Sequence, residues 1–480
     1  RRFNPKLERS RFAPAPFLTK DALVSFWGWG APMMKWIART ILVLILAVGG
    51  FLAFMLVPGL MVPLPEPEAA APAKPATPDE WRKASLADLA AIKQLLEDHT
   101  PIPFDAENPA HGRWLTEGYA KAQALAAQAQ DENGHFFALS YYVNGFQDPH
   151  IAFSLTGERP DPQWPGFIAA MKGKNAQVVH RDDSDANAPA LGAEISSCDG
   201  LSLDAFARQR ILPYSGNGKI ALSRRQTGVR IFLDRRNPFA ERAASCVFET
   251  SEGPKSVALQ WRDIPQNADA KKAWYDKARD AFAGAAAEWG VTEPAPGVTW
   301  IGVPTFSSGE DTAPKLRQLI ADVNLKAAAM RQGRAIVIDT RGNGGGNTFW
   351  SERLTRAIFP EDAVKGWSKA SGQSAADWRA SEGNARFWRQ TSRAYETEFG
   401  PMTVETLGAL YLAGAIWAHK DDKPPIWRFP WDGKPGPTGG LTLKRPKSGN
   451  PPFPAKVYFL SNGSCGSTCL NFADETLMIP

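Results

Sequence analysis

The chain has 480 residues, of which 44% are hydrophobic and 22% charged, so its length allows about three domains of ordinary globular composition. Lys and Arg number 55 against 50 Asp and Glu, and this net charge of +5 is scattered along the chain. These values exclude a disordered chain, a collagen-like repeat and a polytopic membrane protein, and the absence of a basic stripe argues against a nucleic-acid partner.

The first element is a long apolar segment. Residues 40–65 contain no charged residue, and residues 41–57 are continuously apolar or glycine. About 20 such residues cross a bilayer as a helix, which predicts one transmembrane anchor at 36–62. The alternative is a cleaved signal peptide, whose apolar region is normally shorter, at about 7–15 residues.

The charges beside this segment predict its orientation. Two basic residues precede it and two acidic residues follow it, namely Lys35, Arg39, Glu66 and Glu68. The positive-inside rule then makes 1–35 a cytoplasmic tail and places the bulk of the chain outside the cytoplasm. We therefore expect a single-pass protein of the inner (plasma) membrane with its main part in the periplasm. Because the first methionine is Met33, residues 1–32 are alternatively a spurious extension.

A linker and a helical region come next. Residues 63–80 are rich in proline and alanine, which is typical of an extended linker. Residues 81–159 form an N-terminal helical region, with apolar residues at helical spacing over 86–96 and 114–130. The apolar run 151–155 follows a polar turn and is interpreted as a strand.

Residues 160–265 change character, because short β-rich runs alternate with turns. The runs predict strands at 176–180, 192–200, 228–233, 245–250 and 256–261. Asp199-Gly200 is a strong hairpin-turn signal, and a helix is expected over 203–211. This part of the chain is predicted to be a small β-rich module.

From residue 266 onward the pattern is α/β. A strand at 298–303, an amphipathic helix at 312–331 and a strand at 335–339 follow one another in the order of a crossover unit. The glycine-rich loop 341–347 (RGNGGGN) then leads into a helix expected over 348–358.

An insertion separates this unit from the last strand. Residues 361–450 are rich in Trp, Pro, Gly and Lys, with a helix expected over 403–418. The strand 456–460 (KVYFL) follows and enters the segment SNGSCGSTC, after which a helix is expected to begin near Ser467.

The glycine-rich loop is the first candidate for chemistry. A strand that ends in Asp339, a run of glycines and a helix N-terminus present free backbone N–H groups, which can bind a phosphate or a developing oxyanion. The loop is neither a P-loop nor a dinucleotide fingerprint, because no Lys-Ser/Thr follows and the glycines do not fit that register. The alternative is a tight turn without a ligand.

Ser467 is the second candidate. A serine held at a turn between a strand and a helix has the arrangement of a nucleophile elbow, in which the next backbone N–H is free. The plain alternative is an N-cap serine that only satisfies the start of a helix.

His150 is the third candidate, in the turn Gln147-Asp148-Pro149-His150. None of the six histidines forms a metal-ligating pair on one helix, so neither a metal nor another cofactor is expected. A lone histidine is more often structural than catalytic.

Four cysteines are too few for a disulfide scaffold. Cys198 and Cys246 lie in β-rich runs and are the better candidates for a disulfide if the domain is exported. Cys465 and Cys469 flank Ser467 and could form a local disulfide, but we favour small buried thiols there.

Together these segments resemble the C-terminal processing (tail-specific) and tricorn-core serine proteases. The segment Asp339 to Gly346 (DTRGNGGG) resembles their D-L-R-x-N-x-G-G signature, and Cys465 to Ala473 resembles their nucleophile segment. Asp148-Pro149-His150 is similar to their D-G-H segment, although Pro149 replaces a glycine. Residues 192–200 (GAEISSCDG) are similar to part of a PDZ module.

The resemblance implies an α+β multidomain protein. After the anchor and linker, it would contain a helical region (81–159), a PDZ-like module (160–265) and a ClpP/crotonase-like serine protease core (266–480) with the insertion 361–450. The sequence ends 13 residues after Ser467, so the core is expected to be truncated and a third catalytic group, Lys or Glu, to lie beyond residue 480.

The implied activity is that of a membrane-anchored serine endopeptidase that forms an acyl-enzyme on Ser467. His150 would be the base, and the N–H groups of Gly345 and Thr468 would form the oxyanion hole. Three residues would brace the loop, namely Asp339, Arg341 and Asn343. Polypeptide substrates would bind through their C-termini as an added strand on the PDZ-like module.

A second class of function remains open. Retinoid-binding relatives use the same fold without catalysis, so the chain could be a hydrophobic-ligand or peptide-binding protein. Several tryptophans of the insertion could line such a groove or simply pack it on the core, namely Trp367, Trp378, Trp388, Trp417, Trp427 and Trp431. A membrane-anchored PDZ scaffold is a third possibility and would not require Ser467.

Overall fold

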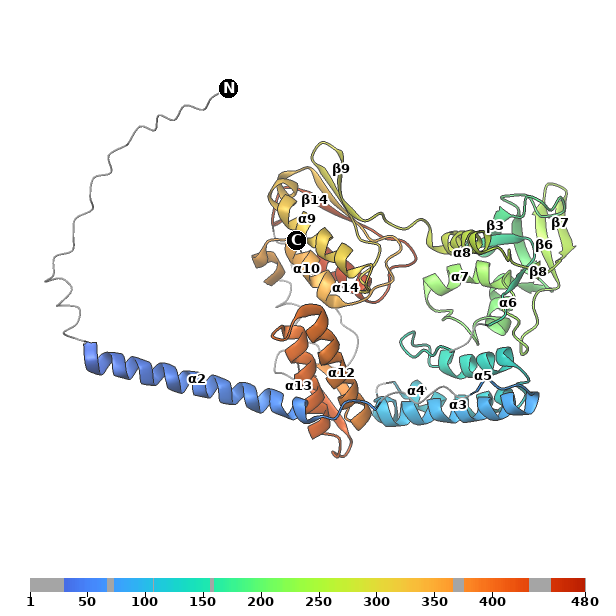
Figure 1. Cartoon of the computed structure of the whole chain (residues 1–480). Coiled ribbons are helices and arrows are strands. Elements are labelled where there is room, and N and C mark those ends of the chain that lie inside the picture. The colour runs from blue at the N-terminus through green and yellow to red at the C-terminus, as the bar shows by residue number, and fades with distance from the viewer. Residues whose placement is uncertain are drawn as a thin grey trace, which may run out of the picture. The chain divides into compact units, whose positions relative to one another are not determined.

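The computed structural model describes residues 30–66, 73–106, 108–155, 159–365, 375–430 and 450–479. The chain divides into two compact units (Figure 1). One contains the residues up to Glu66 together with Glu382–His419, and the other contains the rest. Most of the expected tail at 1–35 lies outside the described residues, as do parts of the linker (67–72) and of the insertion (366–374 and 431–449).

Within its described residues, the smaller unit contains three helices, α2 (Gly30–Met61), α12 (Glu382–Phe399) and α13 (Val404–Ala418). The backbones of α2 and α13 approach closely at two glycines. A Cβ at Gly59 would lie 2.0 Å from the Leu410 carbonyl oxygen, and one at Gly414 would lie 2.6 Å from the Gly59 nitrogen. Only glycine permits this approach, so the C-terminal end of α2 is fixed against α13.

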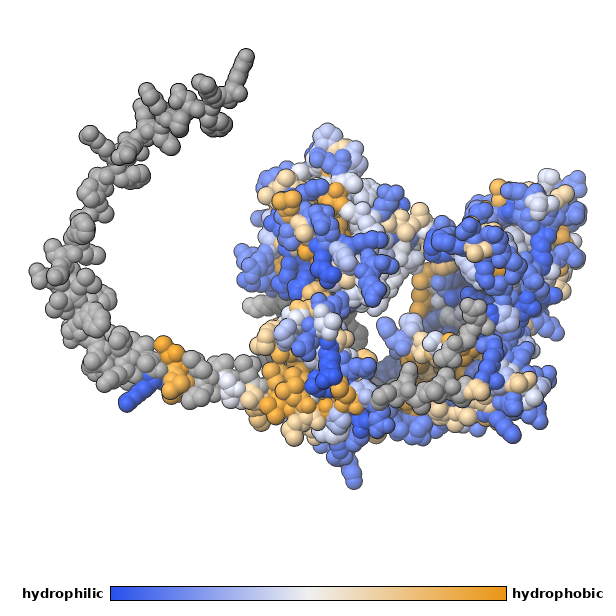
Figure 2. All heavy atoms as spheres, in the orientation of Figure 1, coloured by the Kyte–Doolittle hydropathy of each residue, from blue (hydrophilic) through white to orange (hydrophobic). Residues whose placement is uncertain are grey.

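The transmembrane anchor expected at 36–62 is wrong. Among the residues that the structure describes, no helix has both the length and the apolar character that a membrane span requires. An apolar run does not distinguish a helix in lipid from one packed on another helix, and Gly59 of α2 is buried against α13. Figure 2 shows hydrophobic residues gathered over these helices, where Met402 and Val404 are 76% and 83% exposed.

The helical region of the larger unit contains α3 (Pro78–His99), a short 3-10 helix (Ile102–Phe104), α4 (Pro109–Ala126) and α5 (Glu132–Asn144). Thr77 begins α3 with a complete capping box to Glu80. The helices bury one core that includes Leu89, Tyr142 and Phe146. The two predicted helices are confirmed, whereas the strand expected at 151–155 is wrong because residues 152–155 form no regular element.

A six-stranded sheet forms the β-rich module. Its strands are β2 (Phe167–Lys172), β3 (Asn175–Arg181), β4 (Glu194–Cys198), β5 (Leu201–Ser202), β6 (Ser245–Thr250) and β7 (Gly253–Ala258). Their order is β2-β3-β4-β6-β7, with β5 paired to β4 through the predicted Asp199-Gly200 turn, where both residues have positive φ. Two short strands, β1 (Gln163–Trp164) and β8 (Arg262–Asp263), pair beside it.

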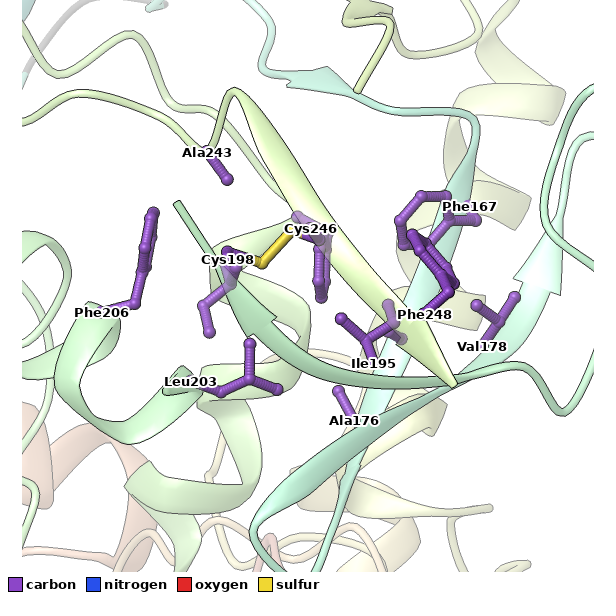
Figure 3. Close-up of a cluster of buried hydrophobic side chains, with 13 residues drawn as sticks. Phe167, Ala176, Val178, Ile195, Cys198, Leu203, Phe206, Ala243, Cys246 and Phe248 are labelled. Atoms are coloured by element: carbon purple, nitrogen blue, oxygen red, sulfur yellow. A yellow bond between two sulfur atoms is a disulfide. The ribbon is translucent and has the colours of Figure 1, made fainter. Parts of the chain in front are cut away.

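The core of this module contains a disulfide. Cys198 and Cys246 face each other across β4 and β6 and are bonded, within a cluster that includes Phe167, Ile195 and Phe248 (Figure 3). The disulfide that we considered for these two cysteines is therefore confirmed.

Two helices cover the sheet, α6 (Leu203–Arg210) as predicted and α7 (Ala221–Ile231). The strand expected at 228–233 is wrong, because most of it is the end of α7. Gly228 explains the difference, since a Cβ there would lie 2.7 Å from the Met171 nitrogen of β2. Helix α7 thus packs directly on a strand backbone, a tertiary contact that local propensity does not reveal.

Helix α8 (Ala268–Ala283) leads to the α/β core, whose sheet has the order β14-β11-β10-β9. Its elements are β9 (Gly290–Ala295), β10 (Val298–Gly302), α9 (Ala313–Gln332), β11 (Ala335–Asp339), α10 (Thr348–Ile358), β14 (Lys456–Leu460) and α14 (Thr468–Met478). Strands β10, β11 and β14 are parallel, so the predicted crossover unit is confirmed.

Two strands belong to the described part of the insertion, β12 (Ala375–Arg379) and β13 (Ile426–Pro430), and they pair with each other. The chain is thus a mixed α/β protein. The carboxyl ends of β11 and β14 lie side by side, with Asp339 opposite Leu460, and the glycine-rich loop and the Ser467 turn both follow from this edge.

Candidate active site

Ser467 lies at the N-cap of α14 in an unusual backbone conformation. Its φ of 49° and ψ of −124° lie in a region that residues other than glycine rarely adopt. The residue is exposed, whereas the next two, Thr468 and Cys469, are buried. A strained, exposed serine between a strand and a helix fits the geometry of a nucleophile elbow.

The hydroxyl of Ser467 does not cap its helix. At the start of α6, by contrast, Ser202 accepts a hydrogen bond from the Ala205 N–H in the ordinary N-cap manner. Among the described residues, neither the Ser467 hydroxyl nor the Thr468 N–H has a hydrogen-bond partner. The N-cap alternative considered for Ser467 therefore does not account for its side chain.

The glycine-rich loop packs directly on the Ser467 turn. A Cβ at Gly345 would lie 2.8 Å from the Ser467 Cβ and 2.7 Å from the Gly466 carbonyl oxygen. The Thr468 hydroxyl donates to the Gly346 carbonyl at 2.6 Å, which ties α14 to the loop. The structure thus brings Gly345 together with Ser467 and Thr468, although Gly345 precedes both by more than 100 positions in sequence.

Three polar side chains hold the loop in shape. Asp339 is fully buried and forms an ion pair of 2.6 Å with Arg341. Burial disfavours the charged carboxyl, but hydrogen bonds from the Arg341 side chain and backbone outweigh it and lower the pKa of Asp339. Asn343, also buried, donates to the Val303 carbonyl at 2.9 Å. These contacts lie within or beside the loop.

The two residues predicted to form the oxyanion hole differ in their hydrogen bonding. The Gly345 N–H donates to the Asn343 side-chain oxygen at 2.9 Å, whereas the Thr468 N–H is free among the described residues. Thr468 can therefore donate to an oxyanion as the structure stands. For Gly345, a role in the oxyanion hole stays a prediction. It requires the Gly345 N–H to release the Asn343 oxygen and donate to the oxyanion instead.

His150 lies in the turn after α5, and its side chain is 78% exposed. Its Nδ1 is 3.2 Å from the Asp148 carboxylate, and its backbone N–H donates to the same oxygen. Among the described residues, the structure shows no contact between His150 and Ser467. Asp148 belongs to the same sequence motif, but no role was predicted for it. An Asp two residues before a histidine is close enough in sequence to have indicated this contact.

One segment connects the His150 turn to the Ser467 turn. Asn217 donates from its side chain to the Gln147 carbonyl beside His150, and Ile220 and Ser223 line a cavity of about 370 Å³ with Asp148. At the other end, a Cβ at Gly463 would lie 3.2 Å from Leu222. The turns of the two predicted catalytic residues therefore flank the same segment, 217–223.

Cys465 and Cys469 are joined by a disulfide, with 5.3 Å between their Cα atoms. Our preference for small buried thiols at these positions is wrong. Cys465 comes just before α14 and Cys469 lies in its first turn, a separation that places the two sulfurs within bonding distance. The disulfide closes a short loop around Ser467.

No group of three or more His, Cys, Asp or Glu side chains that could hold a metal occurs in the part of the chain that the structure describes.

Comparisons with known proteins give a distant likeness. No family model matches the chain, and no curated protein matches it. Among solved structures, it is similar to a crystal structure of a mutant of the protein CPAF. The two are 12% identical, with 83% of this chain and 82% of that chain covered and a TM-score of 0.48. A likeness this distant does not establish a shared activity.

Proposed function

We propose that the chain is a serine-type peptidase that forms an acyl-enzyme on Ser467. The observation that carries this proposal is the exposed, strained Ser467 at the start of α14, whose hydroxyl makes no cap hydrogen bond. A structural serine would be expected to cap the helix, as Ser202 does. The free N–H of Thr468 beside it supplies a donor for the negative charge that develops during acyl transfer.

In the proposed reaction, the Ser467 oxygen bonds to the carbonyl carbon of a peptide while its proton passes to Nε2 of His150. The carbon–nitrogen bond then breaks, and the leaving amine takes that proton. A water molecule gives its proton to His150 and attacks the acyl-enzyme, which releases the acid and restores the Ser467 hydroxyl.

Asp148 would set the tautomer of His150. A carboxylate only accepts hydrogen bonds, so the 3.2 Å contact with Nδ1 places the imidazole proton on Nδ1. Nε2 then carries the free lone pair that a general base needs. The reaction requires Nε2 to come within about 3 Å of the Ser467 hydroxyl, and such contacts often form only once substrate is bound.

Two further parts of the proposal concern substrate and compartment. Polypeptides are the proposed substrates, and their C-terminal segments would add to the sheet of the β-rich module. Two disulfides support a location outside the cytoplasm, because the cytosol keeps thiols reduced.

A fluorophosphonate probe tests the proposal, because it labels only activated serines. The full chain should be labelled, and Ser467→Ala should abolish the label. Ser464→Ala changes a serine of the same turn and should leave the label intact. His150→Ala should slow labelling by about 10²-fold or more, since loss of the base leaves the hydroxyl protonated.

A folded chain that takes no label would overturn the proposal. That result would favour the second candidate, a protein that binds peptides or hydrophobic ligands without cleaving them. A label that survives Ser467→Ala would instead place the nucleophile elsewhere.

A further inference from the structure

A second cavity lies in the larger unit, away from Ser467, and has a volume of about 130 Å³. It is bounded by α5, α6, α7 and the segment 233–242. Much of its wall is apolar, from side chains of Phe137, Phe206, Ile211, Tyr214, Ile231 and Leu233. Four arginines and two acidic residues also line it. The charge of a suitable ligand depends on which of these arginines are already paired with a carboxylate.

Two of the four arginines are neutralised by carboxylates. Arg210 forms an ion pair of 2.8 Å with Asp199, and Arg242 forms one of 3.1 Å with Asp234. The other lining acid, Glu241, is 90% exposed and reaches only Arg210, at 4.0 Å. Both acidic residues of the cavity are thus directed at these two arginines.

Arg230 and Arg235 are left without a carboxylate. Among the described residues, neither has an ion-pair partner, and the Arg230 side chain makes one hydrogen bond, to the Ser215 carbonyl at 3.1 Å. Burial, with the positive charge of Arg235, lowers the pKa of Arg230 to about 10. The pKa of Arg159 is lowered to about 10 in the same way, first by burial and then by Arg235.

Arg230 is half-buried, and withdrawing an unpaired charge from water is costly, so an anion that entered the cavity would stabilise it. A guanidinium matches a carboxylate through paired N–H donors, and the aromatic and aliphatic wall suits a short hydrocarbon body. We propose that this cavity is a binding site for a small carboxylate with an apolar tail, held by Arg230 and Arg235. The proposal does not depend on Ser467 or on peptidase activity.

The volume favours a free small acid over a peptide segment. Pentanoate is therefore a suitable probe, because it combines one carboxylate with four more carbon atoms. Pentanamide has nearly the same shape without the charge, and it separates ion pairing from simple filling of an apolar space.

The test measures the melting temperature of the full chain against pentanoate concentration at constant ionic strength. Pentanoate should raise the melting temperature in a saturable manner, because a ligand that binds only the folded state stabilises it. Pentanamide should leave it unchanged. Equal shifts with both compounds, or no shift with pentanoate, would overturn the proposal.

Arg230→Met should weaken pentanoate binding at least about tenfold, because it removes a charged hydrogen-bond donor. Without ligand, the same variant should melt at or above the wild-type temperature, since a half-buried unpaired charge is lost. If Arg230 served only to hold Ser215, its loss would instead lower the melting temperature and leave the ligand effect intact.

Arg224→Met is the matched control, because Arg224 lies on the same helix and also donates to a backbone carbonyl, that of Gly218, but is exposed. It should bind pentanoate as the wild type does. Arg235→Met offers a second test at an exposed position and should weaken binding several-fold without a change in stability. A peptide with a free C-terminal valine that binds where pentanoate does not would overturn the small-acid assignment.

Discussion

Gly345 is the residue on which the geometry of Ser467 depends most closely. Its φ is 102°, and the space that a side chain would need is filled by the Ser467 turn. The glycine therefore serves both the conformation of the loop and the approach of the loop to the nucleophile.

Gly345→Ala should reduce fluorophosphonate labelling by about 10²-fold, because a Cβ would displace Ser467 or its loop and such small shifts are costly. Gly344→Ala is a sharp comparison, since its Cβ would meet no atom within 4 Å and its φ is not positive. Labelling rates of the two variants, measured side by side, check the prediction. Equal rates would contradict it.

The residues that surround Ser467 could be predicted from the sequence, because the glycine-rich loop and the Ser467 segment are both short, local motifs. The hydrogen bond from the Gly345 N–H to Asn343 could not be predicted. Asn343 is held in place by the Val303 carbonyl, which lies at the end of a different strand, 40 positions earlier. The location of His150 relative to Ser467 also depends on long-range packing, so its catalytic role stays a prediction.

Elements of the α/β core followed the sequence pattern closely. Strands β11 and β14 and helix α10 have the predicted bounds, because each combines a clear apolar period with glycine, proline or a capping residue at its ends. The failures occurred where packing overrides local preference, as at Gly228 of α7 against β2 and in the apolar run 151–155.

The disulfide between Cys465 and Cys469 is expected to fix the start of α14. Replacing both cysteines by alanine removes the constraint on a short loop, worth roughly 2 kcal/mol in the chain-entropy account. Labelling of Ser467 should slow markedly as the turn loosens, and the melting temperature should fall.

The other disulfide provides the control. Replacing Cys198 and Cys246 by alanine should lower the melting temperature, because both are buried in the core of the β-rich module. It should leave the labelling rate of the folded protein near that of the wild type. If both double variants slowed labelling equally, a specific role for the pair at Ser467 would be excluded.

Stability of the whole molecule should depend on pH through Glu475 of α14, which is only 4% exposed. Burial raises the pKa of this carboxyl to about 7, against the opposing effect of a hydrogen bond with Thr355. The Thr355 hydroxyl lies 3.0 Å from the Ser351 carbonyl and 2.7 Å from Glu475. A hydroxyl that donates to Ser351 can accept the proton of a neutral Glu475.

Because the folded state holds this proton more tightly than the unfolded state, the stabilisation is complete below about pH 4.5 and is lost as pH rises toward 7. The loss is at most about 3 kcal/mol. Glu475→Gln, which stays neutral, should be more stable than the wild type at pH 8 but not at pH 4. Urea unfolding at both pH values measures the difference, and an identical pH dependence in both proteins would contradict the assignment.

The pairing of β11 with β14 has a consequence for biosynthesis. The two strands are neighbours in the sheet, yet Thr340 and Leu460 lie 120 positions apart. Closing a loop of that length costs about 4 kcal/mol, and at ~5–20 residues per second the second strand leaves the ribosome roughly 6–24 seconds after the first. During that interval the apolar β11 has an unpaired edge that a chaperone would need to shield. Ser467 follows β14, so a nascent chain has no assembled nucleophile until that interval is over.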